Sequence, residues 1–184
     1  MYLYTKKTMN TNSEISKKIH YALYTSDIQK YLNNKVKIVL YSELKNYTHI
    51  DQLLKPFNKC VILYQTKKNS GHWTCIYTND TPNNIYFFDS YGLKVDSEWK
   101  FTTKEIKKEL QIYMNYLSKL LLESNRDIHF NQYQLQSSKN GYNGCGRWVC
   151  YRLKYNKLSV NDFYKLFKNF KNKDLIITLL TYNI

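Results

Sequence analysis

One stretch organises the rest of this chain: Gly141-Tyr142-Asn143-Gly144-Cys145-Gly146-Arg147-Trp148-Val149-Cys150. It sets Cys145 between two glycines, which permit close backbone approach and unusual dihedral angles. The apolar run from Trp148 to Leu153 follows and predicts a buried helix that begins at Cys145. At a helix N-terminus, unpaired N–H groups and the helix dipole favour a thiolate over a thiol and can stabilise an oxyanion. Cys145 is therefore the candidate nucleophile.

A nucleophilic cysteine needs a base within reach and a group that orients the base. His72 precedes Trp73 at the predicted start of a strand, so its ring can reach a helix N-terminus across the sheet edge. Asp89 ends the next predicted strand, where its carboxylate can orient the imidazole. Asp89 also opens an Asx-turn pattern over residues 89–92, and the two roles are compatible. The sequence thus offers a base, His72, and an orienting acid, Asp89.

Each candidate has an alternative. His129 begins a later predicted strand near the cysteine loop and is the rival base, whereas His20 and His49 stand in polar contexts. A single histidine is more often a surface or core residue than a catalyst. A free cysteine is usually a buried residue, but the flanking glycines and the helix start favour a nucleophile at Cys145.

Length and composition indicate one ordered domain. The 184 residues suit a single core, and the five glycines and two prolines argue against a disordered chain. We expect a polar leader at residues 1–13 and one domain over residues 14–184. The four cysteines show no CxxC pair and no zinc-finger spacing, so we expect no metal and no cofactor.

The segments that direct proteins to membranes or to secretion are not seen in the sequence. Its first residues lack the apolar core of a signal peptide, and no apolar run reaches the length of a membrane span. We therefore expect a reduced, intracellular protein that does not use a membrane, and we expect it to be a monomer.

Positive charge is concentrated at the two ends of the chain. The formal net charge is +14, with 12 Lys/Arg against 4 Asp/Glu in residues 1–70, 7 against 8 in residues 71–130, and 9 against 2 in residues 131–184. This excess favours a polyanion such as nucleic acid, or an acidic protein partner. A solvated lysine-rich surface explains it equally well. Two clusters stand out: Lys100, Lys104, Lys107 and Lys108, and Lys165, Lys168, Lys171 and Lys173.

Short apolar runs predict the strands of a sheet. Three runs rich in β-branched and aromatic residues indicate neighbouring strands, the latter two in a hairpin. They cover residues 60–64, 73–77 and 85–88. Alternation at Val36, Ile38 and Leu40 predicts a further strand, and residues 128–136 predict another.

Helical spacing predicts the helices. The segments are 14–34, 102–124 and 159–170, while 174–180 could be a helix or a strand. Thr102 and Glu105 form a predicted capping box, and Ser159 with Asp162 forms another cap. We therefore predict an α+β fold, with a central mixed sheet flanked by helices.

Three motifs in fixed order resemble a known family. His72-Trp73, then Phe88-Asp89-Ser90-Tyr91-Gly92, then Gly144-Cys145-Gly146 are similar to the adenovirus maturation protease (adenain) and its relatives, the SUMO-specific proteases. The resemblance spans about residues 26–184 and is strongest to the capsid-maturation proteases of virophages and polinton-like viruses. It implies a papain-like core in permuted order and a thiol endopeptidase, with Cys145 as nucleophile, His72 as base and Asp89 as orienting acid.

The resemblance also implies a biological role. The substrates would be viral capsid or other virion precursor proteins, cleaved after small-residue motifs such as Gly-Gly or Gly-X-Gly. The protein would act in the virion and the host cytoplasm, with DNA or a peptide as a possible activator. Two alternatives remain: a deubiquitinase-like or deSUMOylase-like protease acting on a ubiquitin-like modifier, and a non-catalytic, basic nucleic-acid-binding protein on the same scaffold.

One position departs from the family pattern. The family has an oxyanion-hole glutamine six or seven residues before the cysteine, where this chain has Lys139 and Ser138. A longer loop over residues 137–144 can still bring Gln136 to the site, so Gln136 is the preferred donor. The other amides near the cysteine are Gln134, Asn140 and Asn143. Loss of such a donor typically costs about 10²–10³ in rate.

Overall fold

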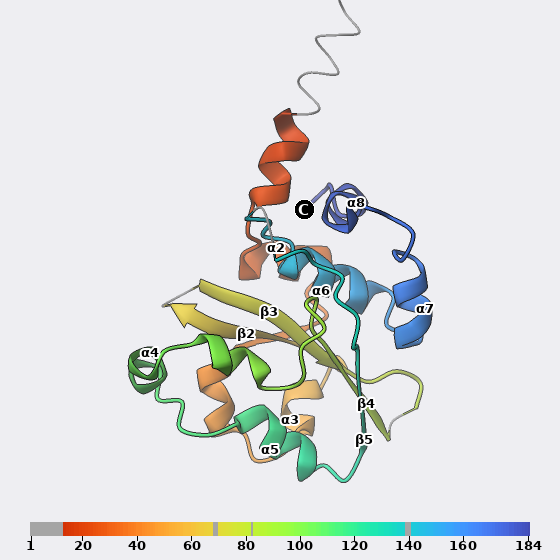
Figure 1. Cartoon of the computed structure of the whole chain (residues 1–184). Coiled ribbons are helices and arrows are strands. Elements are labelled where there is room, and N and C mark those ends of the chain that lie inside the picture. Colours follow the sequence, from red (N-terminus) through yellow and green to blue (C-terminus); the bar gives the residue numbers. More distant parts are fainter. Residues whose placement is uncertain (1–12, 68–69, 82, 139–140) are drawn as a thin grey trace, which may run out of the picture.

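The structure is a computed structural model that describes residues 13–67, 70–81, 83–138 and 141–184. Its centre is a five-stranded sheet in the order β1-β2-β3-β4-β5 (Figure 1). The strands are β1 (Lys37–Leu40), β2 (Lys59–Lys67), β3 (Ser70–Tyr77), β4 (Asn84–Phe88) and β5 (Asp127–Phe130).

The sheet is mixed, as predicted. β2, β3 and β4 pair in antiparallel fashion, while β1 is parallel to β2 and β5 is parallel to β4. The predicted hairpin of residues 73–77 and 85–88 is therefore confirmed as the pair β3 and β4. The strand predicted over residues 128–136 is too long, because β5 ends at Phe130. The following segment turns away, and the N–H groups of Leu135 and Gln136 donate to the Ser90 carbonyl, each at 2.9 Å.

Strand alternation divides the apolar side chains between two cores. On β2, Val61 and Leu63 face one core, while Ile62 and Tyr64 face the other. This follows from the two-residue period of a strand, and both faces are apolar because helices cover both. A sheet buried on both faces holds its strand ends rigidly, and residues at those ends are therefore well placed for a functional site.

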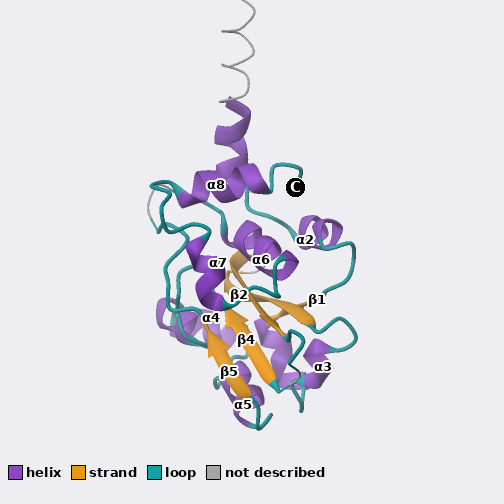
Figure 2. Ribbon diagram, turned by 90° about the vertical axis from the view of Figure 1, so that its right-hand side faces the viewer, coloured by secondary structure: helices purple, strands orange, loops and turns teal. Residues whose placement is uncertain are grey.

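Helices cover each face of the sheet (Figure 2). One face carries α2 (Thr25–Tyr31), α6 (Cys145–Lys154), α7 (Val160–Lys165) and α8 (Lys173–Leu180). The other carries η1 (Tyr41–Asn46), α3 (Asp51–Leu54), η2 (Ser97–Phe101), α4 (Lys104–Glu109) and α5 (Tyr116–Leu122). The α+β prediction is confirmed. Within the described ranges, no helix is both long and apolar enough to cross a bilayer.

The helix predicted over residues 14–34 is interrupted. Residues 13–20 are helical and α2 begins at Thr25, so residues 21–24 form a break. The break is held in place by Trp73, whose indole Nε1 donates to the Leu23 carbonyl at 2.9 Å. Most of the predicted leader, residues 1–12, lies outside the described residues, and residue 13 already belongs to the first helix.

The helix predicted over residues 102–124 is wrong as a single element. α4 ends at Glu109, and Gln111 adopts a left-handed conformation with φ of +56°. The N–H of Gln111 donates to Lys108 O and that of Ile112 to Lys107 O, which is the Schellman pattern of a helix end. The N-cap is Thr103, whose hydroxyl accepts from Ile106 N, so the predicted capping box of Thr102 and Glu105 is wrong and the cap lies one residue later.

The C-terminal helices follow the prediction more closely. Ser159 caps α7 by accepting from Asp162 N at 3.0 Å, as predicted, although the helix ends at Lys165 rather than near residue 170. Residues 173–180, which the sequence left open between helix and strand, form α8.

Candidate active site

Cys145 is the first residue of α6, as predicted. The first main-chain hydrogen bond of the helix runs from Trp148 N to Gly144 O at 3.0 Å, so the N–H groups of Cys145, Gly146 and Arg147 precede the helical ladder. These three groups lie where a developing oxyanion beside the Cys145 thiol would find donors.

Cys145 is the one accessible thiol among the four cysteines. It is partly exposed, whereas Cys60, Cys75 and Cys150 are buried. Burial raises the pKa of the Cys60 thiol to about 12, and burial also raises the pKa of Cys75 and of Cys150. The three buried thiols are therefore inert, and thiol chemistry is confined to Cys145.

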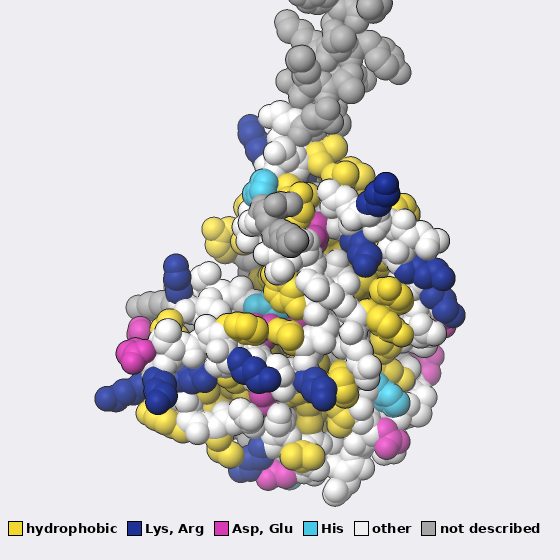
Figure 3. Space-filling view, viewed as in Figure 1, with side chains coloured by type: hydrophobic (Ala, Val, Ile, Leu, Met, Phe, Trp, Pro, Cys, Tyr) yellow, Lys and Arg dark blue, Asp and Glu magenta, His cyan; other side chains and the backbone are white. Residues whose placement is uncertain are grey.

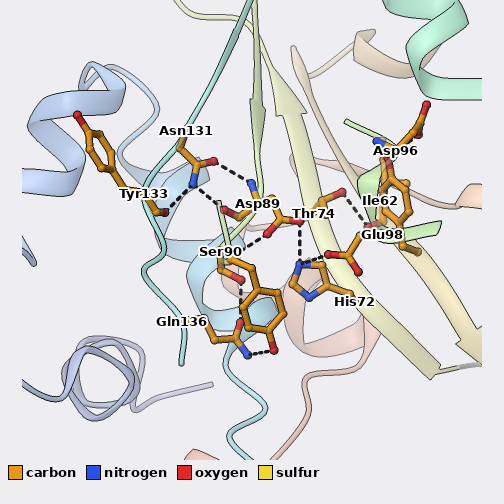
Figure 4. A network of polar contacts seen from close by, with 12 residues as sticks. Ile62, His72, Thr74, Asp89, Ser90, Asp96, Glu98, Asn131, Tyr133 and Gln136 are labelled. Atoms are coloured by element: carbon orange, nitrogen blue, oxygen red, sulfur yellow. Dashed lines mark hydrogen bonds and ion pairs between the residues drawn. The ribbon is translucent and has the colours of Figure 1, made fainter. Parts of the chain in front are cut away.

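His72 and Asp89 meet at one end of the sheet (Figure 4). The β3–β4 ladder ends at the Cys75–Phe88 pair, so the side chains just beyond it lie at the same edge. His72 Nε2 is 3.2 Å from Asp89 Oδ2, with His72 7% exposed and Asp89 fully buried. The structure thus brings together the predicted base and the predicted orienting acid, with Nε2 of the ring toward the acid.

The environment of His72 favours the protonated imidazole. Burial by itself would lower the pKa of His72, but the hydrogen bond with Asp89 and the interaction with the Cys145 thiol outweigh burial. The pKa of His72 therefore lies well above its ordinary value. A histidine that stays protonated beside a cysteine stabilises the thiolate form of that cysteine.

Asp89 is held rigidly by its own turn and by a residue that sequence reasoning missed. Its Oδ1 accepts from Tyr91 N at 2.6 Å, which confirms the predicted Asx-turn. Asn131 follows β5 and bridges the main chain of Asp89, accepting from Asp89 N at 3.0 Å and donating to Asp89 O at 2.6 Å. Asn131 also donates to Tyr133 O at 3.2 Å. These bonds therefore hold the Asp89 carboxylate in one position beside the His72 ring.

Gln136 lies in the same network. Its Oε1 accepts from Ser90 Oγ at 2.7 Å, and its Nε2 donates to Tyr91 Oη at 3.1 Å and to Tyr142 O at 3.2 Å. The Tyr91 ring stacks on the His72 ring, with centroids 4.8 Å apart. Gln136 thus connects the His72 side of the site to the cysteine loop. Its role as an oxyanion donor stays a prediction.

The other amides considered from the sequence are placed differently. Gln134 and Asn143 are exposed, and their side-chain amides donate to Gln136 O and to His20 O. Asn140 lies outside the described residues. The rival base His129 is exposed on β5 and stacks on Tyr86, with ring centroids 4.9 Å apart.

Asp174, at the start of α8, fixes the long loop before Cys145. Its Oδ2 accepts from Ser137 N at 2.8 Å, and its Oδ1 accepts from Trp148 Nε1 at 3.2 Å. Asp174 is 2% exposed, so these bonds are shielded from water. One buried carboxylate therefore ties the start of the loop to α6, the helix that carries Cys145.

Glu98 is a second acid at the ring of His72, and the sequence analysis did not identify it. Glu98 Oε1 lies 3.7 Å from His72 Nε2. The ligand atoms of His72, Asp89 and Glu98 fall within 4.8 Å of one another, a spacing that a metal ion could also span. Because Nε2 already faces Asp89 at hydrogen-bond distance, we interpret the trio as a hydrogen-bonded cluster rather than as metal ligands.

A groove of about 520 Å³ lies beside the strand that carries His72. Segment 22–25 forms one wall, and Gly71 and Trp73 form another. The groove adjoins the helix of the nucleophile, because a Cβ built on Gly146 would lie 2.9 Å from Leu23 Cβ and 3.2 Å from Trp73 Cδ1.

The α+β fold of this chain is similar to that of a solved protease structure. The ASFV pS273R protease matches with a TM-score of 0.50 and 12% identity, over 86% of this chain and 66% of that protease, so the chain spans about two thirds of its length. The SUMO protease Ulp1 matches with a TM-score of 0.43 and 18% identity, over 85% of this chain and 73% of Ulp1. No protein-family model matches the chain.

The chain belongs to the family of the uncharacterized protein V9 of Sputnik virophage. The two are 38% identical over 144 residues, which are 78% of this chain and 82% of V9. The more specific resemblance to adenain stays a prediction.

Proposed function

We propose that this protein is a cysteine endopeptidase whose catalytic residues are Cys145, His72 and Asp89. One observation carries the proposal: the buried His72 ring interacts with Asp89 on one side and with the Cys145 thiol on the other. Cys145 adds partial exposure and a helix N-terminus to this arrangement. A nucleophile, a base and a group that orients the base are the parts that nucleophilic catalysis requires.

The chemistry follows from this arrangement. Cys145 transfers its proton to Nδ1 of His72, and the thiolate attacks the scissile carbonyl carbon to form a tetrahedral oxyanion. The peptide C–N bond then breaks, the amine leaves with the proton from His72, and a thioester remains on Cys145. Water, deprotonated by His72, hydrolyses the thioester and regenerates the thiol. Asp89 holds the ring and stabilises the imidazolium throughout.

Two groups of donors serve the oxyanion in this proposal. The main-chain N–H groups at the start of α6 face the position beside the thiol. Gln136 would add its amide by exchanging its bond to Tyr142 O for one to the substrate. Gln136 is 2% exposed, so the surrounding residues keep its side chain in place while the amide changes hydrogen-bond partner.

The substrates we propose are capsid or other virion precursor proteins, cleaved within the infected host cell and in the virion. Membership in a family with a virophage protein supports a viral setting. The groove beside Trp73 supports an extended peptide as substrate. By the family resemblance, cleavage would follow small residues such as Gly-Gly or Gly-X-Gly.

The test is cleavage of a candidate capsid precursor, with peptide profiling to define the motif. We expect Cys145→Ala and His72→Ala to reduce cleavage by at least about 10³-fold, because each removes a group that takes part in bond making or proton transfer. His129→Ala is the matched control, because this exposed histidine lies away from the site. Cleavage at the wild-type rate by either site variant would contradict the proposal.

The same experiment separates the alternatives. Efficient hydrolysis of a ubiquitin or SUMO reporter without precursor cleavage would favour a ubiquitin-like modifier as substrate. An unreactive Cys145 together with salt-dependent DNA binding would favour a non-catalytic nucleic-acid-binding protein.

The basic surface is a physical reason to consider nucleic-acid binding, either as the main role of the protein or as activation by DNA. Lys and Arg side chains gather over α4 and over the α7–α8 region (Figure 3). Beside Gln136 lies a polar basin of about 490 Å³ whose lining includes Lys168, Lys171 and Lys173. Either a polyanion or an acidic stretch of a protein substrate would be attracted to this basin.

A further inference from the structure

Two carboxyl groups lie at one nitrogen of the His72 ring. Asp89 Oδ2 is 3.2 Å from Nε2, and Glu98 Oε1 is 3.7 Å from the same atom. All three side chains are at least nine-tenths buried. Among the described residues, Glu98 Oε1 has no hydrogen-bond partner. A buried carboxylate oxygen without a donor is costly, so its position beside the ring requires an explanation.

The segment that carries Glu98 is anchored on both sides of it. Asp96 accepts from Tyr64 Oη at 2.9 Å and from Ser118 N at 2.8 Å, which fixes the start of η2. Trp99, which is 5% exposed, packs against Tyr41 and Tyr64 with ring centroids 4.6 and 5.4 Å away. Glu98 lies between these two anchors, so its carboxyl is held at His72 by the fold.

The charged and titratable groups that act on Glu98 come from two strands of the sheet. His72 lies on β3, and Asp89 and Tyr91 follow β4. Burial raises the pKa of Glu98 to about 7; the nearby His72 opposes this rise, and the charge and hydrogen bond of Asp89 add to it. Glu98 therefore changes charge within the pH range in which a cysteine peptidase works.

We propose that Glu98 is a positioning residue that acts through His72: when ionised, it supports the imidazolium that pairs with the Cys145 thiolate, and when protonated, it shares its proton with Asp89. On ionisation the proton passes to solvent, and two carboxylates then flank Nε2. The imidazolium holds its proton more tightly in that state, because an opposite charge within about 4–6 Å favours the charged form. The inference rests on the proposed function for its catalytic meaning.

The test measures the His72 ring directly. The ring resonances of the four histidines are followed by NMR from pH 5 to pH 10 in the wild type and in Glu98→Gln, with His72→Ala to assign the signal. Gln keeps the size of the side chain and removes its charge. We expect the midpoint of the His72 titration to fall by about one pH unit, a tenfold loss in proton affinity, which is the scale of one partly screened charge at this distance.

Further substitutions distinguish the effect of the Glu98 charge from the effect of its packing. Glu98→Asp retains a carboxylate and should restore part of the shift, whereas Glu98→Ala should behave as Glu98→Gln or lower the midpoint further. Asp89→Asn should lower the midpoint more than Glu98→Gln, because Asp89 is nearer the ring. An unchanged His72 midpoint in a folded Glu98→Gln protein would overturn the proposal.

Activity provides an independent measurement. In Glu98→Gln the alkaline limb of kcat/KM should move to lower pH with little change in KM, because protonated His72 is needed to protonate the leaving amine. A uniform loss at every pH would indicate a structural role only and would overturn the proposal. Alkylation of Cys145 by iodoacetamide follows the thiolate, so in Glu98→Gln its rise should move to higher pH without any substrate, because a weaker imidazolium supports the thiolate less. A shifted NMR and alkylation profile without peptide cleavage would refute the proposed function and retain the role of Glu98.

Discussion

Asp89 serves the site only if its carboxylate stays at one place relative to the His72 ring. The Asx-turn fixes one carboxylate oxygen on Tyr91 N, and the other oxygen is free to face the ring. Asn131 fixes the main chain of Asp89 from the opposite side. The orienting acid thus depends on one residue that touches neither the thiol nor the imidazole.

Replacing Asn131 tests this dependence. Asn131→Ala should lower the free energy of unfolding by about 1–3 kcal/mol, because it leaves the buried N–H of Asp89 without its partner and leaves Gly92 N as the donor to the Asp89 carbonyl. We also expect kcat to fall by about tenfold with little change in KM. Denaturant unfolding and steady-state kinetics measure the two effects. Asn83→Ala is the control, because Asn83 is exposed and its hydrogen bond to Asp127 is long, at 3.4 Å. Equal effects of the two substitutions would contradict this role for Asn131.

The three residues of the proposed site were found from local patterns. Cys145 has glycines on both sides and an apolar run after it, and His72 and Asp89 lie at the ends of predicted strands. Asn131 and Glu98 have no such local signal. Asn131 meets Asp89 from 42 positions away along the chain, and Glu98 lies on a short 3-10 turn between two buried anchors. Only the folded arrangement shows which acid and which amide reach the site.

At the scale of elements, local sequence patterns predicted the strands better than the long helix. The strand predictions over residues 60–88 succeeded because each run is short, apolar and bounded by polar residues, so pattern and length agree. The long helix failed because an apolar stripe at helical spacing continues across a helix end. α4 stops at a left-handed Gln111 rather than at a glycine, and the usual glycine signal is therefore missing. α2 ends in the same way at Asn33, with φ of +53°.

α6 is the element whose packing decides the geometry of the nucleophile. Gly146→Ala should destabilise the protein by about 1–3 kcal/mol and lower cleavage, because the new Cβ would lie 2.9 Å from Leu23 Cβ and force the groove wall outward. Gly144→Ala, two residues earlier, is the matched control, since the nearest atom to its Cβ would be Asp174 Oδ1 at 3.3 Å. Thermal unfolding and cleavage assays compare the two. A Gly146→Ala protein as stable and as active as Gly144→Ala would argue against close packing at this point.

At the scale of the whole molecule, the site joins the two layers that the sheet separates. Cys145 comes from α6 on one face, Glu98 comes from η2 on the other, and His72 and Asp89 lie at the end of the sheet between them. Side chains from both layers therefore reach the imidazole of His72. Because the cluster takes up or releases protons on folding, the stability of the whole molecule must depend on pH.

Burial raises the pKa of Glu98 in the folded protein to about 7, above the ordinary value of 4.5. Between these pH values the folded protein binds more protons than the unfolded chain, so the stability that protonated Glu98 contributes is fully present below about pH 4.5 and is lost as the pH rises through about 7. Glu98→Gln removes this titration, and the variant should therefore lose less stability than the wild type between pH 5 and pH 8, by about 1–3 kcal/mol. Urea unfolding across this range measures the difference. Glu123→Gln is the control, because the Glu123 side chain is 51% exposed. If the stability of the wild type and that of Glu98→Gln changed with pH in parallel, Glu98 would not change its charge in this pH range.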